Sequence, residues 1–262
     1  MTQQQRFESV PDLTGKVMAG IPAYNTAKHI ADVVERTLEV ADHVVVVDDG
    51  STDDTAVIAR AAGATVVSHA QNRGYGGAIR TCFEYAEAAN ASVLVTVDGD
   101  GQHFPEDIAC LLEPLTAGRA AVVIGSRFLE TSQSSGLARV PEYRSFGIRV
   151  ITFLFNVASG CRVTDAQCGL RAYNHKAIRR LMPDKPGMDV SVELIVNARA
   201  RGLRMAEVPV SVLYHDGSST QPPITHGIQV ALAVLKFRSQ AVVTRWLARL
   251  LQHRSTRRES GA

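Results

Sequence analysis

The sequence contains no apolar run long enough to span a lipid bilayer. A spanning helix needs roughly 20 consecutive apolar residues, and the best candidate, which follows Gly227, is interrupted by Lys236 and Arg238. Nothing at the start of the chain resembles a signal peptide. We therefore expect a protein that does not cross a membrane.

The chain also has few cysteines and a small net charge. The four cysteines, Cys82, Cys110, Cys161 and Cys168, show neither metal-ligand nor redox spacing. Few, unpatterned cysteines predict a reducing, cytoplasmic environment. The formal net charge is only +2, which gives no reason to expect nucleic-acid binding.

Two signatures of nucleotide-binding enzymes are missing. No glycine-rich run ends in Gly-Lys-Ser or Gly-Lys-Thr, which argues against a P-loop NTPase. The loop at residues 74–79 lacks the final glycine of a dinucleotide-binding loop, which argues against an NAD enzyme.

What is present is a regular alternation of short apolar runs and helical segments. In 262 residues, 45% of them hydrophobic, we expect a flexible leader (1–15), one globular domain (16–225) and a C-terminal segment (226–262). The pattern predicts strands at 16–21, 44–47, 65–68, 94–97 and 121–124, and helices at about 27–40, 78–89, after Pro105 and at 190–201. This order predicts an α/β fold with a mostly parallel central sheet flanked by helices. Ligands of such sheets bind at the carboxyl ends of the strands.

The strand at 94–97 ends in two carboxylates one residue apart. Asp98 and Asp100 flank a glycine, and Gln102 can add a neutral oxygen. Oxygen ligands of this kind suit Mg²⁺ or Mn²⁺, and a sparse set leaves coordination positions for substrate phosphates. The alternative is an ordinary Asp-Gly turn without a metal.

Other polar residues follow neighbouring strands at the same expected rim. Tyr24 could pack against a nucleotide base, and Asp49 could accept hydrogen bonds from a base or ribose. Arg127 follows the strand at 121–124 and is close enough to meet a phosphate, although a solvated surface arginine would look the same in sequence. Residues 129–142 are rich in Ser, Gly and Pro and predict a mobile lid before a helix that carries Arg144.

Six motifs in order resemble glycosyltransferase family 2, most closely its dolichol-phosphate mannosyltransferase and polyprenyl-phosphate glycosyltransferase branch. They are Ile21-Pro22-Ala23-Tyr24-Asn25, Val46-Val47-Asp48-Asp49-Gly50-Ser51, Asn72-Arg73-Gly74, Asp98-Gly99-Asp100-Gly101-Gln102-His103, Gly125-Ser126-Arg127 and Asp165-Ala166-Gln167-Cys168-Gly169-Leu170-Arg171. The resemblance covers about residues 16–220. It implies a GT-A type domain for a nucleoside-diphosphate sugar and metal-dependent, inverting sugar transfer.

The resemblance also implies roles for individual residues. The nucleotide-sugar site would comprise Pro22, Ala23, Tyr24, Asn25, Val47, Asp49, Asp98, Gly99, Asp100, Gln102 and Arg127. Asp98, Asp100 and Gln102 would surround Mg²⁺ or Mn²⁺, while Arg127 and Arg144 match basic positions associated with donor or acceptor phosphates.

Two departures from the family pattern concern specificity. Thr26 stands where the family often has Glu. Near the end of the domain, the stretch at 214–220 lacks the arginine and lysine common in this branch, and His215 is the one residue there that could partly replace them. The identity of the sugar and acceptor is therefore open.

The acceptor decides whether a base is needed. A hydroxyl acceptor must lose a proton to a carboxylate, for which Glu193 is the candidate, whereas a lipid phosphate arrives largely ionised. A structural role for Glu193 is the alternative. Two other classes remain open from sequence, a sugar-1-phosphate nucleotidyltransferase and a non-catalytic nucleotide-binding module.

The C-terminal stretch 228–251 has the pattern of a basic amphipathic helix. Apolar residues including Trp246 recur at helical spacing, with arginines beside them and at the ragged end. Such a helix either packs on the domain or on a second subunit, or it lies on an anionic membrane surface where a lipid-phosphate acceptor would be found.

Overall fold

The computed structural model describes residue 7 and residues 10–129 and 142–213. In chain order the elements are β1 (Val17–Ala23), α1 (Ile30–Leu38), β2 (His43–Asp48), α2 (Thr55–Ala61), β3 (Thr65–Ser68), α3 (Tyr75–Ala88), β4 (Val93–Thr96), the 3-10 turn η2 (Pro105–Asp107), α4 (Ile108–Thr116), β5 (Val122–Ser126), α5 (Glu142–Ser159), β6 (Arg171–Asn174), α6 (His175–Ile178), α7 (Val190–Ala200) and β7 (Met205–Pro209).

The strands form one seven-stranded sheet in the order β3-β2-β1-β4-β6-β5-β7. Strand β6 is antiparallel to both of its neighbours, β4 and β5, and the remaining pairs are parallel. The predicted α/β fold with a mostly parallel sheet is therefore confirmed. Strands β1, β2, β4 and β5 point the same way, so the loops after them meet at one rim.

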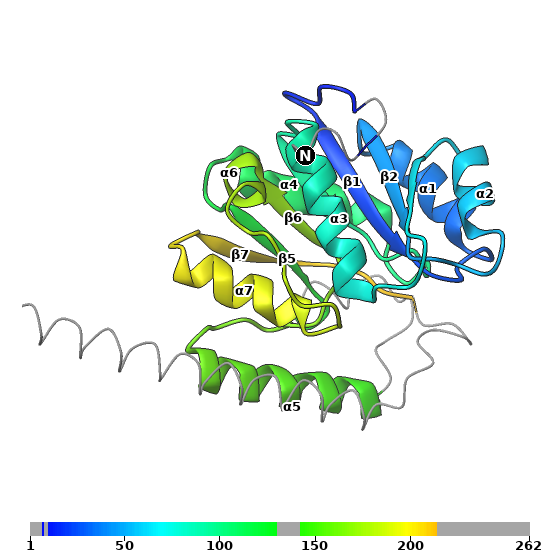
Figure 1. The fold of residues 1–262 in the computed structure, drawn as a ribbon. Coiled ribbons are helices and arrows are strands. Elements are labelled where there is room, and N and C mark those ends of the chain that lie inside the picture. The colour runs from blue at the N-terminus through cyan, green and yellow to red at the C-terminus, as the bar shows by residue number, and fades with distance from the viewer. Residues whose placement is uncertain (1–6, 8–9, 130–141, 214–262) are drawn as a thin grey trace, which may run out of the picture.

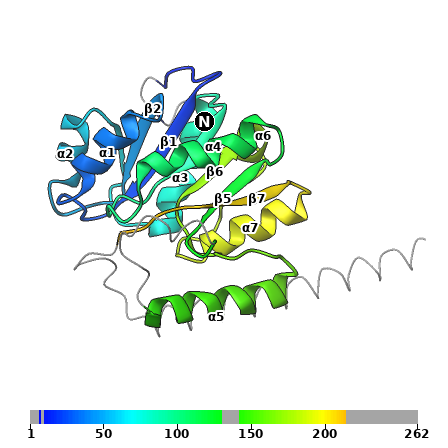
Figure 2. The same cartoon turned by 180° about the vertical axis from the view of Figure 1, so that it is seen from behind.

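Helices cover both faces of the sheet. Helices α3, α5, α6 and α7 contribute to one buried cluster, and α1, α2 and α4 to the other. Figure 1 looks onto the face covered by α3 and α7, and Figure 2 shows α4 on the opposite face. Helix α5 lies beyond α7, at the margin of the layers, in both views.

The apolar runs became strands because both of their faces are covered. In β2, the side chains of Val44 to Val47 are all buried, alternately in the two clusters. Helix α3 packs closely on β1: a Cβ added at Gly20 would lie 2.8 Å from the Cβ of Cys82. All four cysteines are unpaired thiols.

The structure differs from the sequence expectations at the end of β1. The strand continues through Pro22 to Ala23 instead of ending at Ile21. Pro22 is tolerated because pairing with β4 has ended at Gly20 and Thr96, so no ladder bond needs its missing N–H. Strands β6 and β7 had no predicted counterpart.

Several expectations fall outside the described residues. These are most of the leader 1–15, most of the lid at 129–142, the stretch 214–220 with His215, and the C-terminal segment 226–262. Arg144 lies in α5, but its side chain is not described. Within the ranges that are described, no helix combines the length and apolarity needed to cross a membrane.

Candidate active site

Asp98 is held by side chains from two other segments. The Tyr75 hydroxyl, at the start of α3, donates a 2.9 Å hydrogen bond to Oδ1, and Nε2 of His103 lies 3.6 Å from Oδ2. About a quarter of the Asp98 side chain is exposed. Burial raises the pKa of Asp98, but His103, Tyr75 and nearby Arg127 outweigh it and hold the pKa below its ordinary value. Asp98 is thus a fixed, ionised carboxylate at the end of β4.

Asp100 is held by Gln102, whose backbone N–H donates to Oδ1 at 3.1 Å and whose side-chain amide donates to Oδ2. Burial, and then the charge of Asp98, raise the pKa of Asp100. A divalent cation between the carboxylates would relieve this repulsion, so the pair fits Mg²⁺ or Mn²⁺. In this arrangement Gln102 positions Asp100, and its role as a metal ligand stays a prediction. Among the described residues, no three His, Cys, Asp or Glu side chains group as a metal site.

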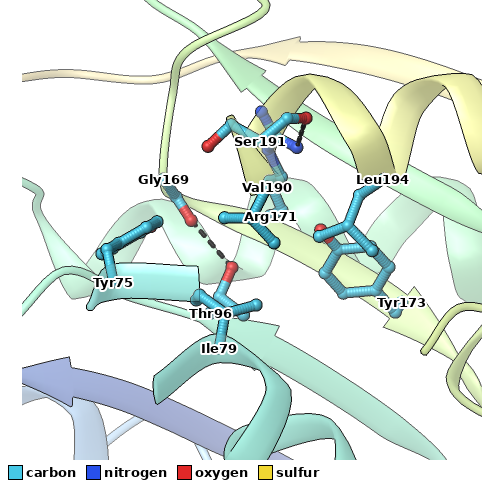
Figure 3. A pocket seen from close by; sticks show the side chains of 9 residues that line it. All are labelled: Tyr75, Ile79, Thr96, Gly169, Arg171, Tyr173, Val190, Ser191 and Leu194. Carbon is cyan, nitrogen blue, oxygen red and sulfur yellow. Dashed lines mark hydrogen bonds between the residues drawn. The ribbon is translucent and has the colours of Figure 1, made fainter. Parts of the chain in front are cut away.

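A glycine closes the site on the far side of Asp98. A Cβ added at Gly169 would overlap the Asp98 carboxylate, so only glycine fits there. The carbonyl oxygen of Gly169 accepts a 2.7 Å hydrogen bond from the Thr96 hydroxyl, which fastens this backbone to the last residue of β4 (Figure 3).

Asp49 organises a neighbouring loop. Its buried carboxylate accepts hydrogen bonds from the backbone N–H groups of Arg73 and Gly74, at 2.9 and 2.8 Å. Nδ1 of buried His69 lies 2.6 Å from the same carboxylate, and Nε2 of His69 lies 2.9 Å from the Thr81 hydroxyl. Asp49 therefore holds the Asn72-Arg73-Gly74 loop beside the site. Its predicted contact with a nucleotide stays a prediction.

The loops after β1 and β2 interlock. Asn25, which has a positive φ of 51°, accepts a 2.8 Å bond from the N–H of Thr52, and its own N–H donates to the Ser51 hydroxyl. Tyr24, directly before Asn25, has 47% of its surface exposed, so its side chain is accessible to a base. Four other residues that the sequence assigned to the donor site are buried: Pro22 and Ala23 in β1, Val47 in β2, and Gly99 in the loop after β4.

Arg127 lies at the predicted rim, but it is not a solvated arginine. Its Nε and Nη2 donate to Oδ2 and Oδ1 of Asp165, at 2.6 and 2.9 Å. The Arg127 side chain is 11% exposed and that of Asp165 is completely buried. Burial raises the pKa of Asp165, and Arg127 overrides this, leaving the pKa below its usual value. A phosphate contact by Arg127 stays a prediction alongside this ion pair.

Glu193 is buried in the first turn of α7. Its carboxylate accepts hydrogen bonds from the backbone N–H groups of Asp184 (3.2 Å) and Lys185 (3.0 Å). The loop it holds presses on the start of α3, because the N–H of Gly76 donates to Pro186 O at 2.8 Å and a Cβ on Gly76 would overlap Lys185 O. The structure thus gives Glu193 a positioning role, and its role as a base stays a prediction.

A small cavity lies beside the hydrogen bond between Thr96 and Gly169. Its volume of about 10 Å³ is room for about one water molecule. The residues that line it are shown in Figure 3: Tyr75, Ile79, Thr96, Gly169, Arg171, Tyr173, Val190, Ser191 and Leu194. Arg171 is buried, and three of its hydrogen bonds go to the backbone carbonyls of Ala166, Cys168 and Ser191. These bonds fix the segment that carries Gly169 against α7.

Sequence reasoning assigned no role to Tyr75, His103, Asp165 or Gly169, although all four lie within or directly beside the quoted motifs. Tyr75 and Asp165 act through contacts across 23 and 38 residues, Gly169 through the closeness of its backbone to Asp98, and His103 through a contact with Asp98 five residues away. The segment after β7 also reaches the site: His103 bridges to Val212, and the N–H of Leu213 donates to Gln102 O at 2.8 Å. Val212 and Leu213 therefore lie beside the loop that carries the two aspartates.

Comparisons with known proteins agree with this geometry. Residues 19–182 match the sequence family described as Glycosyl transferase family 2. UDP-N-acetylglucosamine–dolichyl-phosphate N-acetylglucosaminyltransferase of Methanococcus voltae is 31% identical, over 76% of this chain and 86% of that protein. Polyprenol monophosphomannose synthase of Mycolicibacterium smegmatis is 29% identical, over 76% and 77% of the two chains.

A solved structure gives the same result for the fold. Glucosyl-3-phosphoglycerate synthase from Mycobacterium tuberculosis, in complex with Mn²⁺, uridine diphosphate and glucosyl-3-phosphoglycerate, has a TM-score of 0.66 and 26% identity. The similarity covers 86% of this chain and 80% of that one. The family match spans more than half of the chain and contains both aspartates at the end of β4. The chain therefore belongs to glycosyltransferase family 2 and is a GT-A type hexosyltransferase.

Proposed function

We propose that this glycosyltransferase moves a sugar from a nucleoside-diphosphate sugar to the phosphate of a polyprenyl or dolichyl lipid, with Mg²⁺ or Mn²⁺ at Asp98 and Asp100. The observation that carries the proposal is the pair of carboxylates at the end of β4: the pKa of Asp98 is lowered, and the pKa of Asp100 is raised by burial and then by the charge of Asp98. The names of the relatives in Methanococcus and Mycolicibacterium support a lipid-phosphate acceptor.

The chain's own residues bind and orient the donor. Tyr75 and Gly169 fix the rotamer of Asp98, and Gln102 fixes Asp100, so the carboxylates are ordered before substrate arrives. Tyr24 offers an exposed ring to the base at the neighbouring loop. A bound divalent cation would neutralise the charge that develops on the leaving nucleoside diphosphate.

A lipid phosphate needs no general base. Its second pKa is about 6, so the attacking oxygen is already largely ionised at neutral pH. Glu193, the carboxylate considered as a base, is buried and occupied by backbone N–H groups. This arrangement supports a phosphate acceptor. Attack on the face opposite the leaving group inverts the configuration at the anomeric carbon.

The second candidate is transfer to a hydroxyl of a soluble acceptor. The likeness to glucosyl-3-phosphoglycerate synthase favours it, because the product in that complex is a small soluble glycoside. A hydroxyl acceptor would require a base. The two functions therefore make different demands on the same site.

The test is a transfer assay with radiolabelled UDP- and GDP-sugars, Mn²⁺, and either polyprenyl phosphate in detergent or soluble hydroxyl acceptors. We expect label in the organic phase only with polyprenyl phosphate, and none with Asp100→Ala. Label that stays in the aqueous phase, bound to a soluble acceptor, would overturn the lipid assignment in favour of the second candidate. Pyrophosphate release from a nucleoside triphosphate plus a sugar phosphate would contradict sugar transfer altogether.

We further propose that the protein works peripherally at the cytoplasmic face of the cell membrane. The segment 226–262 carries seven Lys and Arg residues and one acidic residue. Each cation near an anionic leaflet contributes about 1 kcal/mol to membrane binding. Binding to anionic vesicles that is lost at high salt is the expected result.

A further inference from the structure

Helix α5 exposes an apolar face. Ten large hydrophobic side chains are exposed in the described residues, and five of them lie on this one helix. They are Phe146 (72% exposed), Val150 (40%), Phe153 (66%), Leu154 (43%) and Val157 (62%). Successive members are separated by one, three or four residues, so they form one stripe about 16 Å long.

The opposite face of α5 is packed against the domain. Ile151 and Phe155 are buried in the core cluster that α3 and α7 share. The buried Thr152 hydroxyl accepts a 3.3 Å hydrogen bond from the N–H of Ala166, next to the Arg127 partner Asp165. The helix is thus anchored to the active-site segment, while the side chains exposed on it include five large apolar ones. Figure 1 shows α5 at the margin of the domain.

The charged residues along the stripe are basic. From Tyr143 to Ser159 the sequence contains no acidic residue, and the one acidic residue of α5, Glu142, is its first residue. Arg149 is exposed on the helix and lies over the Phe128 ring, 5.2 Å from its centroid, and Arg127 lies 6.0 Å from the same ring. The basic, amino-terminal part of the stripe therefore adjoins the active-site rim.

We propose that this face of α5 is a docking surface for an anionic lipid bilayer. The inference rests on the proposed function, because an acceptor whose phosphate is fixed at a bilayer surface must be met by a protein surface beside the site. A stripe of Phe, Leu and Val with arginine at its edge has the composition of helices that lie in the headgroup region.

Two other occupants fit less well. A stable protein interface uses roughly 20 to 30 residues on each side, and the stripe has five. The chain's own segment 226–262 has seven basic residues and one acidic residue, so its charge repels the arginines beside α5. Both basic regions are complementary to an anionic membrane.

The primary experiment is vesicle flotation of the full chain, with vesicles of phosphatidylcholine alone or with about one third phosphatidylglycerol. We expect the wild type to bind the anionic vesicles and the double variant Phe146→Ser/Phe153→Ser to bind at least about ten-fold more weakly, because two rings no longer insert. Val57→Ser is the matched control, since Val57 is 63% exposed on α2 and distant from the stripe. Wild-type binding by the double variant would overturn the proposal.

A direct probe uses the single tryptophan of the chain, Trp246. In Phe153→Trp/Trp246→Phe, the only tryptophan lies on the stripe. We expect its emission to shift to the blue with anionic vesicles and to be quenched by brominated lipids. An unchanged spectrum with bound vesicles would contradict insertion of α5.

Lipid-free measurements identify the alternative occupants. A wild-type dimer that Phe146→Ser/Phe153→Ser dissociates would assign the face to a second copy. A red shift of Trp246 emission in Phe146→Ser/Phe153→Ser would assign it to the chain's own C-terminal segment. Either result overturns membrane docking by α5, and we expect neither.

Transfer assays separate this inference from the proposed function. Phe146→Ser/Phe153→Ser should glycosylate a short, water-soluble prenyl phosphate at the wild-type rate and lose transfer to polyprenyl phosphate in vesicles. If no prenyl phosphate is glycosylated but vesicle binding still depends on Phe146 and Phe153, the acceptor assignment fails and the docking surface stands. If the double variant transfers to polyprenyl phosphate in vesicles at the wild-type rate, the docking surface fails and the acceptor assignment stands.

Discussion

Removing the Arg127 side chain should destabilise the protein as well as impair catalysis. In Arg127→Met, the completely buried Asp165 loses a bidentate partner with bonds of 2.6 and 2.9 Å. Leaving one member of a buried ion pair without its partner costs about 3–5 kcal/mol. At about 2–4 °C per kcal/mol for a domain of this size, the melting temperature should fall by roughly 6–20 °C.

The pH dependence tests the cause. Arg127 holds the pKa of Asp165 below its ordinary value against the effect of burial. A depressed carboxyl pKa contributes stability that is present above the unfolded pKa, about 3.9, and is lost as the pH falls toward the folded pKa. In Arg127→Met the lowering by the guanidinium is lost and burial is opposed only by the backbone N–H groups of residue 127 and Gln167, so Asp165 takes up a proton more readily. The gap in melting temperature between wild type and variant should therefore narrow from pH 7 to pH 5.

The assay is a pair of thermal melts at each pH, together with the double variant Arg127→Met/Asp165→Asn. Replacing the charged carboxylate by an amide should recover about 1–3 kcal/mol of the loss, which is the range of coupling between residues in contact. An Arg127→Met protein that melts like the wild type at pH 7 would refute the buried-pair argument. If it also lacked activity, Arg127 would be a substrate-binding residue only.

Three further predictions concern the carboxylates. Asp100→Ala should abolish metal-dependent turnover with little change in melting temperature, because this partly exposed loop residue adds little to the core. Full activity of the wild-type enzyme in excess chelator would show that the reaction needs no metal. Tyr75→Phe should weaken Mn²⁺ binding in the presence of nucleoside diphosphate by about ten-fold or more, since a hydrogen bond to a charged group contributes about 1.5–3 kcal/mol. Titration calorimetry measures the Mn²⁺ affinity. An unchanged affinity would show that Asp98 does not depend on its hydrogen bond from Tyr75. Glu193→Gln should lower the free energy of unfolding by about 1–3 kcal/mol, because the buried N–H groups of Asp184 and Lys185 lose a charged acceptor. Its folded fraction should keep its turnover rate on lipid phosphate, and a large loss of turnover at unchanged stability would instead make Glu193 a base.

Much of the fold could be predicted from local pattern. Short, valine-rich runs such as Val44 to Val47 favour buried strands, and the helices between them favour parallel connections. These features alone predict that Asp49, Asp98 and Arg127 lie at one rim. Strand β6 was not predicted because Arg171–Asn174 is a short run that begins with arginine. Nothing in the local sequence shows that backbone carbonyls accept the hydrogen bonds of this arginine in the core.

The candidate site divides along the same line. Asp98 and Asp100 could be singled out from sequence because two carboxylates at a strand end have few other uses. The partners that hold them could not: Tyr75 reaches Asp98 from 23 residues away, and Gly169 is required only because its backbone touches that carboxylate. Glu193 and Arg127 have the charges expected of catalytic residues. In the structure both are bonded to other parts of the protein: Glu193 to backbone N–H groups and Arg127 to Asp165.

The sequence by itself determined the alternation of strands and helices as far as β5, the family and the two aspartates, since these depend on periodicity and on residue types close together in the chain. The tertiary structure alone decided that β6 runs antiparallel between β4 and β5, that Arg127 is paired with Asp165, and that the outer face of α5 is exposed. Each of these depends on contacts between residues far apart in the chain. Such contacts decide which side chains are buried and which charges are paired, and the local sequence does not identify them.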